Sequence, residues 1–233
     1  MNKTLGDSFH FERAGLRLKN RAVLAPLTHN MSGAGGDPGQ AELDWLARCA
    51  RGGFGLLIAA ATQVRPGGRC WAGQPALMTD AQQQAFTALA DSARQAGALA
   101  VVQLHHGGMR ALPELNDGAP VGPCALAPGG RYPLGVKGLS EEEILTLIDA
   151  FVIAAERAHG AGLHGVELAD FAARMITADE AGRLVDNLNR QFAGDGLRFV
   201  AVAPERWLLR LENLLTGLGP EGAEVLAGAR ARG

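Results

Sequence analysis

Residues 80–104 read DAQQQAFTALADSARQAGALAVVQL and decide the class of fold. The first part of this stretch carries apolar side chains at helical spacing on one face: Phe86, Leu89 and Ala93. We expect a helix over Asp80–Ala96, with Asp80 as its N-terminal cap and a glycine directly after it. Leu99–Leu104 then forms a short apolar run, which is typical of a strand buried on both faces.

The same alternation of apolar strands and amphipathic helices extends to both sides of this stretch. Further strands are predicted at residues 22–25, 55–61, 165–168 and 197–203. Further helices are predicted at 41–51, from a capping box at Ser140 to about 160, at 178–192, and from about 204. A hairpin of residues 9–11 and 16–18 precedes them. This order of elements predicts a parallel sheet covered by helices.

The sheet is expected to curve as a barrel. No G-x-G-x-x-G motif follows the first strand, which disfavours a doubly wound dinucleotide-binding sheet. A complete eight-unit barrel takes about 250 residues, and this chain of 233 residues shows about five βα units. We therefore predict an α/β fold of the TIM-barrel type, incomplete, with residues 1–233 forming a single domain.

Composition excludes several classes of function. The net charge is −2 and aromatic residues are 5%, so neither a basic field nor a stacking surface favours nucleic acid or anionic lipid. No apolar run is long enough for a membrane span or for export, and we expect a cytoplasmic protein. The three cysteines, Cys49, Cys70 and Cys124, lack metal-ligand spacing and are expected as reduced packing residues.

Candidate functional groups lie where the strands end, since barrel sites form at the carboxyl ends of strands. A flat heterocycle needs hydrogen-bond donors and acceptors along its edge and small side chains beside its ring. Gln103 can both donate and accept, and Ala61 lets the backbone come close. The Thr28 hydroxyl can donate to a ring carbonyl. These residues predict that the opening of the barrel at the carboxyl ends of its strands, its mouth, is partly apolar and partly polar. They do not identify the ligand.

Two features near this mouth have alternative interpretations. His105 and His106 either orient a substrate or are satisfied by backbone groups, and neither alternative is favoured. Trp71 follows a Pro-Gly loop. The two could form a lid together, but we favour the alternative in which the Trp71 side chain simply packs over a loop.

Several ordered motifs resemble one known family. Residues 19–28, KNRAVLAPLT, are similar to the first-strand signature of the old yellow enzymes, the NADH:flavin oxidoreductases. Other segments resemble that family in the same order: 52–58 with Thr62, 102–108, 113–123, 139–143 and 162–167. The resemblance covers residues 8–168, and it is specific because several motifs match in register.

The resemblance implies an FMN-binding TIM barrel. NADH or NADPH would act as reductant, and hydride would pass through FMN to an electrophilic small-molecule substrate. Five residues match FMN-contacting positions of the family: Pro26, Leu27, Thr28, Ala61 and Gln103. No catalytic residue is assigned.

The departures from the family lie after the fourth strand. Ala169 and Ala172 stand where the family carries a His and a His or Asn that hydrogen-bond the substrate, and a methyl group cannot donate. Arg174 stands where a proton-donating Tyr often follows, and a guanidinium is a poor proton donor. We therefore expect impaired alkene reduction.

The last third of the chain permits two alignments with the family. Residues 175–215 resemble a late barrel segment, which implies an internal deletion, or they belong to the middle of a barrel that is truncated afterwards. The glycine-rich phosphate site of the family is replaced by Ala203-Pro204-Glu205-Arg206. Residues 216–233 are expected as a loose tail.

A rival hypothesis is a noncatalytic remnant that binds a ligand or a partner subunit. An open barrel exposes strand edges and apolar inner faces, and this favours a homo-oligomer.

Overall fold

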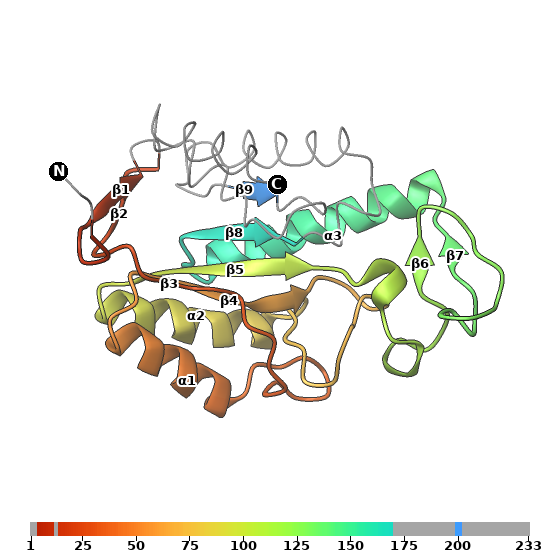
Figure 1. The fold of residues 1–233 in the computed structure, drawn as a ribbon, viewed down its shortest axis with the longest axis horizontal. Coiled ribbons are helices and arrows are strands. Elements are labelled where there is room, and N and C mark those ends of the chain that lie inside the picture. Colours follow the sequence, from red (N-terminus) through yellow and green to blue (C-terminus); the bar gives the residue numbers. More distant parts are fainter. Residues whose placement is uncertain (1–3, 12–13, 170–198, 202–233) are drawn as a thin grey trace.

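The computed structural model describes residues 4–11, 14–169 and 199–201. Their centre is a five-stranded sheet in the order β3-β4-β5-β8-β9, and every neighbouring pair is parallel (Figure 1). The strands are β3 (Val23–Leu24), β4 (Leu56–Gln63), β5 (Leu99–His105), β8 (Gly165–Leu168) and β9 (Phe199–Ala201). Within the described residues β3 and β9 form open edges. The predicted α/β fold with an incomplete barrel is therefore confirmed.

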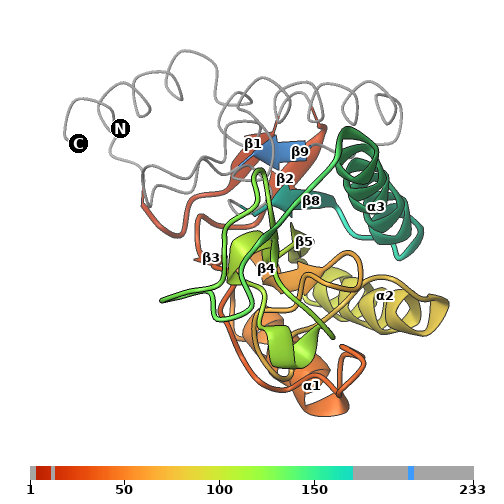
Figure 2. The same cartoon turned by 90° about the vertical axis from the view of Figure 1, so that its right-hand side faces the viewer.

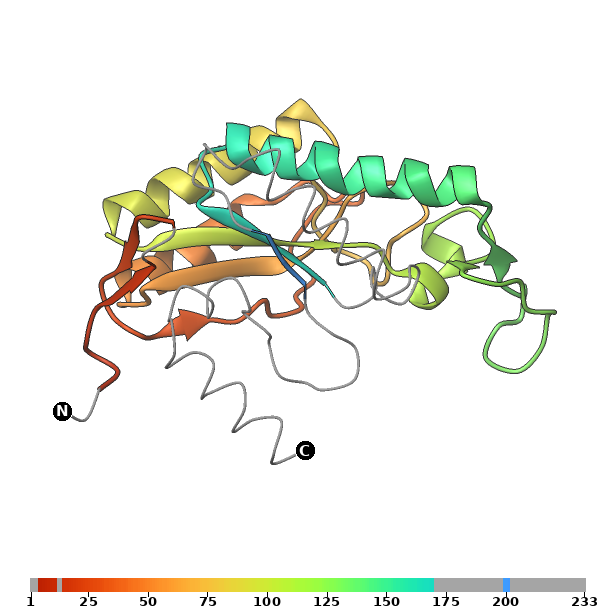
Figure 3. The ribbon, with the colours of Figure 1, turned by 90° about the horizontal axis from the view of Figure 1, so that it is seen from above.

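Three helices cover one face of the sheet (Figures 2 and 3). They are α1 (Gln40–Arg51), α2 (Asp80–Gln95) and α3 (Glu141–Gly160), each within one or two residues of its predicted bounds. The predicted apolar face of α2 is buried, because Phe86, Leu89 and Ala93 are at most 2% exposed. This packing supplies most of the core.

The N-terminal caps of the helices partly differ from expectation. The Ser140 hydroxyl accepts a hydrogen bond from the Glu143 backbone N–H, and the Glu143 carboxylate accepts one from the Ser140 backbone N–H, so the predicted capping box of α3 is confirmed. The prediction that Asp80 caps α2 is wrong. Thr79 is the cap and forms a capping box with Gln82. A threonine one residue earlier, with a glutamine three residues on, satisfies two backbone donors instead of one.

Side chains alternate between the two faces of the sheet. Leu57 and Ala59 of β4 pack with the helices, whereas Leu56 and Ile58 pack on the inner face. The predicted hairpin, β1 (Phe9–Phe11) paired antiparallel with β2 (Leu16–Leu18), is confirmed and packs on that inner cluster. It lies at the amino ends of the strands (Figure 1). Among the described residues the hairpin thus covers the amino end of the inner face, and a ligand site is expected at the carboxyl end.

The segment between β5 and α3 forms an excursion at the carboxyl ends of the strands (Figures 1 and 2). It contains four short elements: η1 (Gly108–Arg110), η2 (Pro113–Leu115), β6 (Val121–Gly122) and β7 (Lys137–Gly138). The sequence predicted this segment as a loop without periodicity, and these elements have only two or three residues each.

Several expectations fall outside the described residues. The predicted helix at 178–192, the helix from about 204 and the tail 216–233 lie there, as does most of the segment with two alignments. Residues 199–201 are described, within the predicted strand 197–203, and pair with β8. The assignment of 1–233 to one domain stays a prediction.

In the described part of the chain, no helix has the length and apolar character to cross a membrane. Nor do the described residues contain a group of three or more His, Cys, Asp or Glu side chains placed to hold a metal ion. All three cysteines are free thiols. Burial raises the pKa of the Cys70 thiol to about 11, so it is protonated near neutral pH.

Candidate active site

The half-buried Gln103 and the buried Glu167 form a polar pair on the inner face of the sheet. Their sequence neighbours on β5 and β8 pack toward the helices, so both side chains face the other way. Gln103 Nε2 donates to Glu167 Oε1 over 2.5 Å, and the two residues are register partners in the sheet. Glu167 is 1% exposed, whereas Gln103 is half-buried. Burial raises the pKa of the Glu167 carboxyl, and the hydrogen bond from Gln103 opposes this shift.

The five predicted flavin positions lie at the ends of three neighbouring strands. Ala61 is half-buried near the end of β4, where the register with β5 shifts between Ala59 and Thr62. Pro26, Leu27 and Thr28 continue from β3, and Leu27 is 51% exposed. The fold therefore gathers these residues at one edge of the sheet, as the sequence predicted, and their contacts with a cofactor stay a prediction.

Gln74 links two of these strand ends and was not singled out from the sequence. It is fully buried, and its Nε2 donates to the Ala61 carbonyl oxygen at 3.0 Å and lies 3.1 Å from His105 Nδ1. Its Oε1 accepts from the Cys70 backbone N–H at 2.8 Å. The amide thereby fixes the position of the Ala61 backbone. Because the Gln74 amide donates to Nδ1, His105 carries its proton on Nε2 when neutral.

His105 and His106 are both buried and held neutral. Burial, together with the nearby His106, lowers the pKa of His105 to about 3. Burial, together with the positive charge of Arg65, lowers the pKa of His106 to about 4. His106 Nδ1 accepts a hydrogen bond from the Gly108 backbone N–H at 3.1 Å. The alternative in which backbone groups satisfy the histidine thus holds for His106.

These histidines predict that stability falls in mild acid. An unfolded histidine titrates near pH 6.5, so below that pH the unfolded chain binds protons that the folded chain excludes. The free energy of unfolding is expected to decrease from pH 7 to pH 5, with about 1–2 kcal/mol of the decrease due to His106. Urea unfolding of His106→Asn, which keeps an acceptor for Gly108, should show a correspondingly smaller decrease. An equal decrease in both proteins would contradict this assignment.

The loop that follows β3 is held by a second buried carboxylate, which the sequence did not indicate. Glu42 is 1% exposed, accepts from Ser32 Oγ at 2.6 Å, and its Oε1 lies 3.1 Å from His29 Nε2. Trp71 Nε1 donates to the His29 carbonyl oxygen at 2.7 Å. These contacts anchor the loop directly after Thr28. They also agree with the interpretation that Trp71 packs over a loop.

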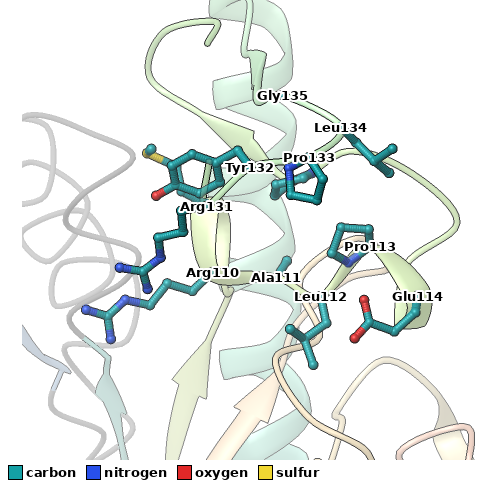
Figure 4. A pocket seen from close by; sticks show the side chains of 12 residues that line it. Arg110, Ala111, Leu112, Pro113, Glu114, Arg131, Tyr132, Pro133, Leu134 and Gly135 are labelled. Carbon is teal, nitrogen blue, oxygen red and sulfur yellow. The ribbon is translucent and has the colours of Figure 1, made fainter. Parts of the chain in front are cut away.

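A pocket of about 550 Å³ lies within the excursion between β5 and α3 (Figure 4). The side chains of Arg110 and Arg131 extend toward the same side of this pocket, and Tyr132 lies near them. The other side is lined by the Glu114 carboxylate and by apolar side chains: Leu112, Pro113, Pro133 and Leu134. Two guanidinium groups beside an apolar wall suit a carboxylate or phosphate attached to an apolar body.

Together these features define a class of protein: a βα-barrel type of fold, open within the described residues, with a candidate ligand site at the carboxyl edge of its sheet. The chain belongs to the NADH:flavin oxidoreductase / NADH oxidase family, whose model matches residues 11–173. Sequence relatives agree with this membership. The probable NADH-dependent flavin oxidoreductase YqiG of Bacillus subtilis is 36% identical over 167 residues, which are 71% of this chain and 44% of that protein. The NADH oxidase of Thermoanaerobacter brockii is 35% identical, over 66% of this chain and 24% of that protein.

Solved structures share the fold. An old yellow enzyme homologue from Zymomonas mobilis matches with a TM-score of 0.68 and 27% identity, over 84% of this chain and 63% of that one. Morphinone reductase matches with a TM-score of 0.73 and 21% identity, over 95% of this chain and 71% of that one, and shows the fold alone. The chain spans less than half the length of YqiG and about a quarter of the NADH oxidase.

Proposed function

We propose that this chain binds FMN at the carboxyl edge of its sheet and is an FMN-dependent oxidoreductase. NADH or NADPH would be the reductant and a small electrophilic molecule the substrate. The observation that carries the proposal is the gathering of Gln103 and Ala61 at neighbouring strand ends, in a chain of the NADH:flavin oxidoreductase family. When bound, FMN would supply the capacity to accept and donate hydride.

The described residues fit such a ring. Gln103 is half-buried beside Glu167, whose Oε2 is buried without a hydrogen-bond partner among the described residues. A polar amide at the edge of an apolar inner face is what a flat neutral heterocycle requires. Gln103 would bind the pyrimidine edge of the ring, and Thr28 would donate to a ring carbonyl.

The remaining positions would shape the site. Ala61 would lie close to the ring because its side chain is small and Gln74 fixes its carbonyl. Pro26 and Leu27 would form the apolar rim that follows β3. The pocket with Arg110 and Arg131 would take an anionic group of the reductant or the substrate.

The substrate-binding pair of the family is absent here, and this predicts a specific kinetic defect. Ala169 is buried directly after β8 and offers only a methyl group, while Ala172 lies outside the described residues. The FMN-loaded protein should oxidise NADH or NADPH, seen as anaerobic bleaching of the flavin band. Its alkene reduction should be about 10²–10³-fold slower than that of full-length relatives, because a positioned hydrogen-bond donor to the reacting group contributes that much.

The double variant Ala169→His/Ala172→His tests this defect, since it should raise the rate of alkene reduction without changing the rate of bleaching. A wild-type rate equal to that of the relatives would contradict the predicted defect. Failure of NADH and NADPH to bleach bound FMN would contradict the proposed reaction.

The open edge of the sheet favours a homo-oligomer. Val23 of β3 is 36% exposed and Leu27 is 51% exposed, so apolar side chains lie beside a strand edge that no other described strand pairs with. The same edge supports the rival function, in which the chain binds a partner subunit without catalysis. Sedimentation of the FMN-loaded and FMN-free protein separates the oxidoreductase from the noncatalytic remnant, because the remnant would assemble equally in both.

The cytoplasm is the proposed location.

A further inference from the structure

We propose that Glu167 is the positioning residue of the site, holding the Gln103 amide so that its carbonyl oxygen accepts a hydrogen bond from the flavin imide N–H. This proposal rests on the proposed binding of FMN. It goes further by assigning a direction to each hydrogen bond of the amide and by giving Glu167 a role.

The geometry determines which way the amide turns. A glutamine amide can rotate by half a turn and exchange its donor for its acceptor. Here Gln103 Nε2 donates to Glu167 Oε1. The carboxylate accepts only, so it selects the orientation with Nε2 toward β8 and Oε1 away from it.

The hydrogen-bonding positions that this orientation leaves unused on the amide match those along the edge of an imide. Among the described residues no group donates to Gln103 Oε1, and none accepts from the second Nε2 hydrogen. An imide presents an N–H flanked by carbonyl oxygens, so Oε1 can accept from its N–H while the remaining Nε2 hydrogen donates to a carbonyl oxygen.

The burial of Glu167 stabilises this orientation of the Gln103 amide. Glu167 is 1% exposed, and its neighbours Val166 and Leu168 pack into the core, so the carboxylate cannot turn into water. A hydrogen bond to a charged acceptor contributes more than one between neutral groups. Removing the carboxylate would leave the half-buried amide free to rotate, and part of the binding energy would then be lost in ordering it.

The test compares FMN with N3-methyl-FMN, which lacks the imide hydrogen. The wild-type protein should bind FMN about tenfold or more tightly than the methylated analogue, the size expected for one buried hydrogen bond plus a steric conflict. In Glu167→Leu, FMN binding should weaken about tenfold, and the preference for FMN should fall to about threefold or less. Glu167→Gln keeps a carbonyl acceptor and should retain most of the preference.

A purely structural role for Glu167 makes a different prediction. Affinity for both flavins would then fall equally, and an unchanged preference in Glu167→Leu would overturn the proposal. Glu167→Met replaces that variant if it does not fold. A second readout needs no flavin: the Gln103 side-chain amide resonances of ¹⁵N-labelled protein should shift in Glu167→Leu, and unshifted resonances would also overturn it. If the wild-type protein binds neither flavin, the proposed function itself fails, a result distinct from an unchanged preference.

Discussion

Replacing Ala61 by leucine is expected to weaken FMN binding by about ten- to a hundredfold. Ala61 is half-buried between buried neighbours, and Gln74 holds its carbonyl oxygen at 3.0 Å, so the backbone cannot withdraw to make room. Extra methylene groups in a packed site oppose binding by about 1–3 kcal/mol, and each 1.4 kcal/mol is about a tenfold change in affinity. Fluorescence titration of the purified variant with FMN measures the loss.

Ala81→Leu is the matched control for this substitution. Ala81 is exposed in the first turn of α2, so the same added side chain should leave FMN affinity unchanged. The midpoint of urea unfolding should be nearly the same in both variants as in the wild type. Equal FMN affinity in Ala61→Leu and wild type would show that Ala61 does not approach the ring.

Replacing Leu89 by alanine is expected to lower the free energy of unfolding by about 3–5 kcal/mol. Leu89 of α2 is 1% exposed and lies in the main core between the helices and the sheet. Its truncation removes buried apolar area and leaves a cavity, and such leucine substitutions have effects of this size. Domains of this kind are stable by only about 5–15 kcal/mol. The midpoint of urea unfolding should therefore fall markedly at an unchanged slope.

Leu145→Ala separates burial from residue type. Leu145 is also helical, in α3, but it is 57% exposed, so its truncation should change stability by less than about 0.5 kcal/mol. Similar losses in the two variants would mean that the α2 face does not form the core described here.

The parts of the fold that local chemistry determines could be predicted from the sequence. Helical periodicity placed α1, α2 and α3 to within one or two residues, and apolar runs placed β4, β5 and β8. The Ser140 capping box was visible because its two partners are three residues apart. Asp80 has the side chain of a typical cap, but Thr79 and Gln82 act together and satisfy two backbone donors, so the helix begins one residue earlier than its carboxylate indicates.

The contacts that build the site could not be predicted, since they join residues far apart in the chain. Gln103 and Glu167 are 64 positions apart and meet only because β5 and β8 are adjacent in the sheet. Gln74 lies in an aperiodic loop, so no pattern marks the amide that joins Ala61 to His105. The register shift between β4 and β5 likewise depends on the pairing of two strands.

The binding of FMN by the folded chain tests the central claim most directly. The protein of residues 1–233, shown by circular dichroism to be folded, is titrated with FMN while the flavin absorbance and fluorescence are followed. We expect saturable binding of one FMN per chain, with a changed visible spectrum and release of the flavin on denaturation. No change in either signal up to about 1 mM FMN, which corresponds to a binding free energy weaker than about −4 kcal/mol, would contradict it.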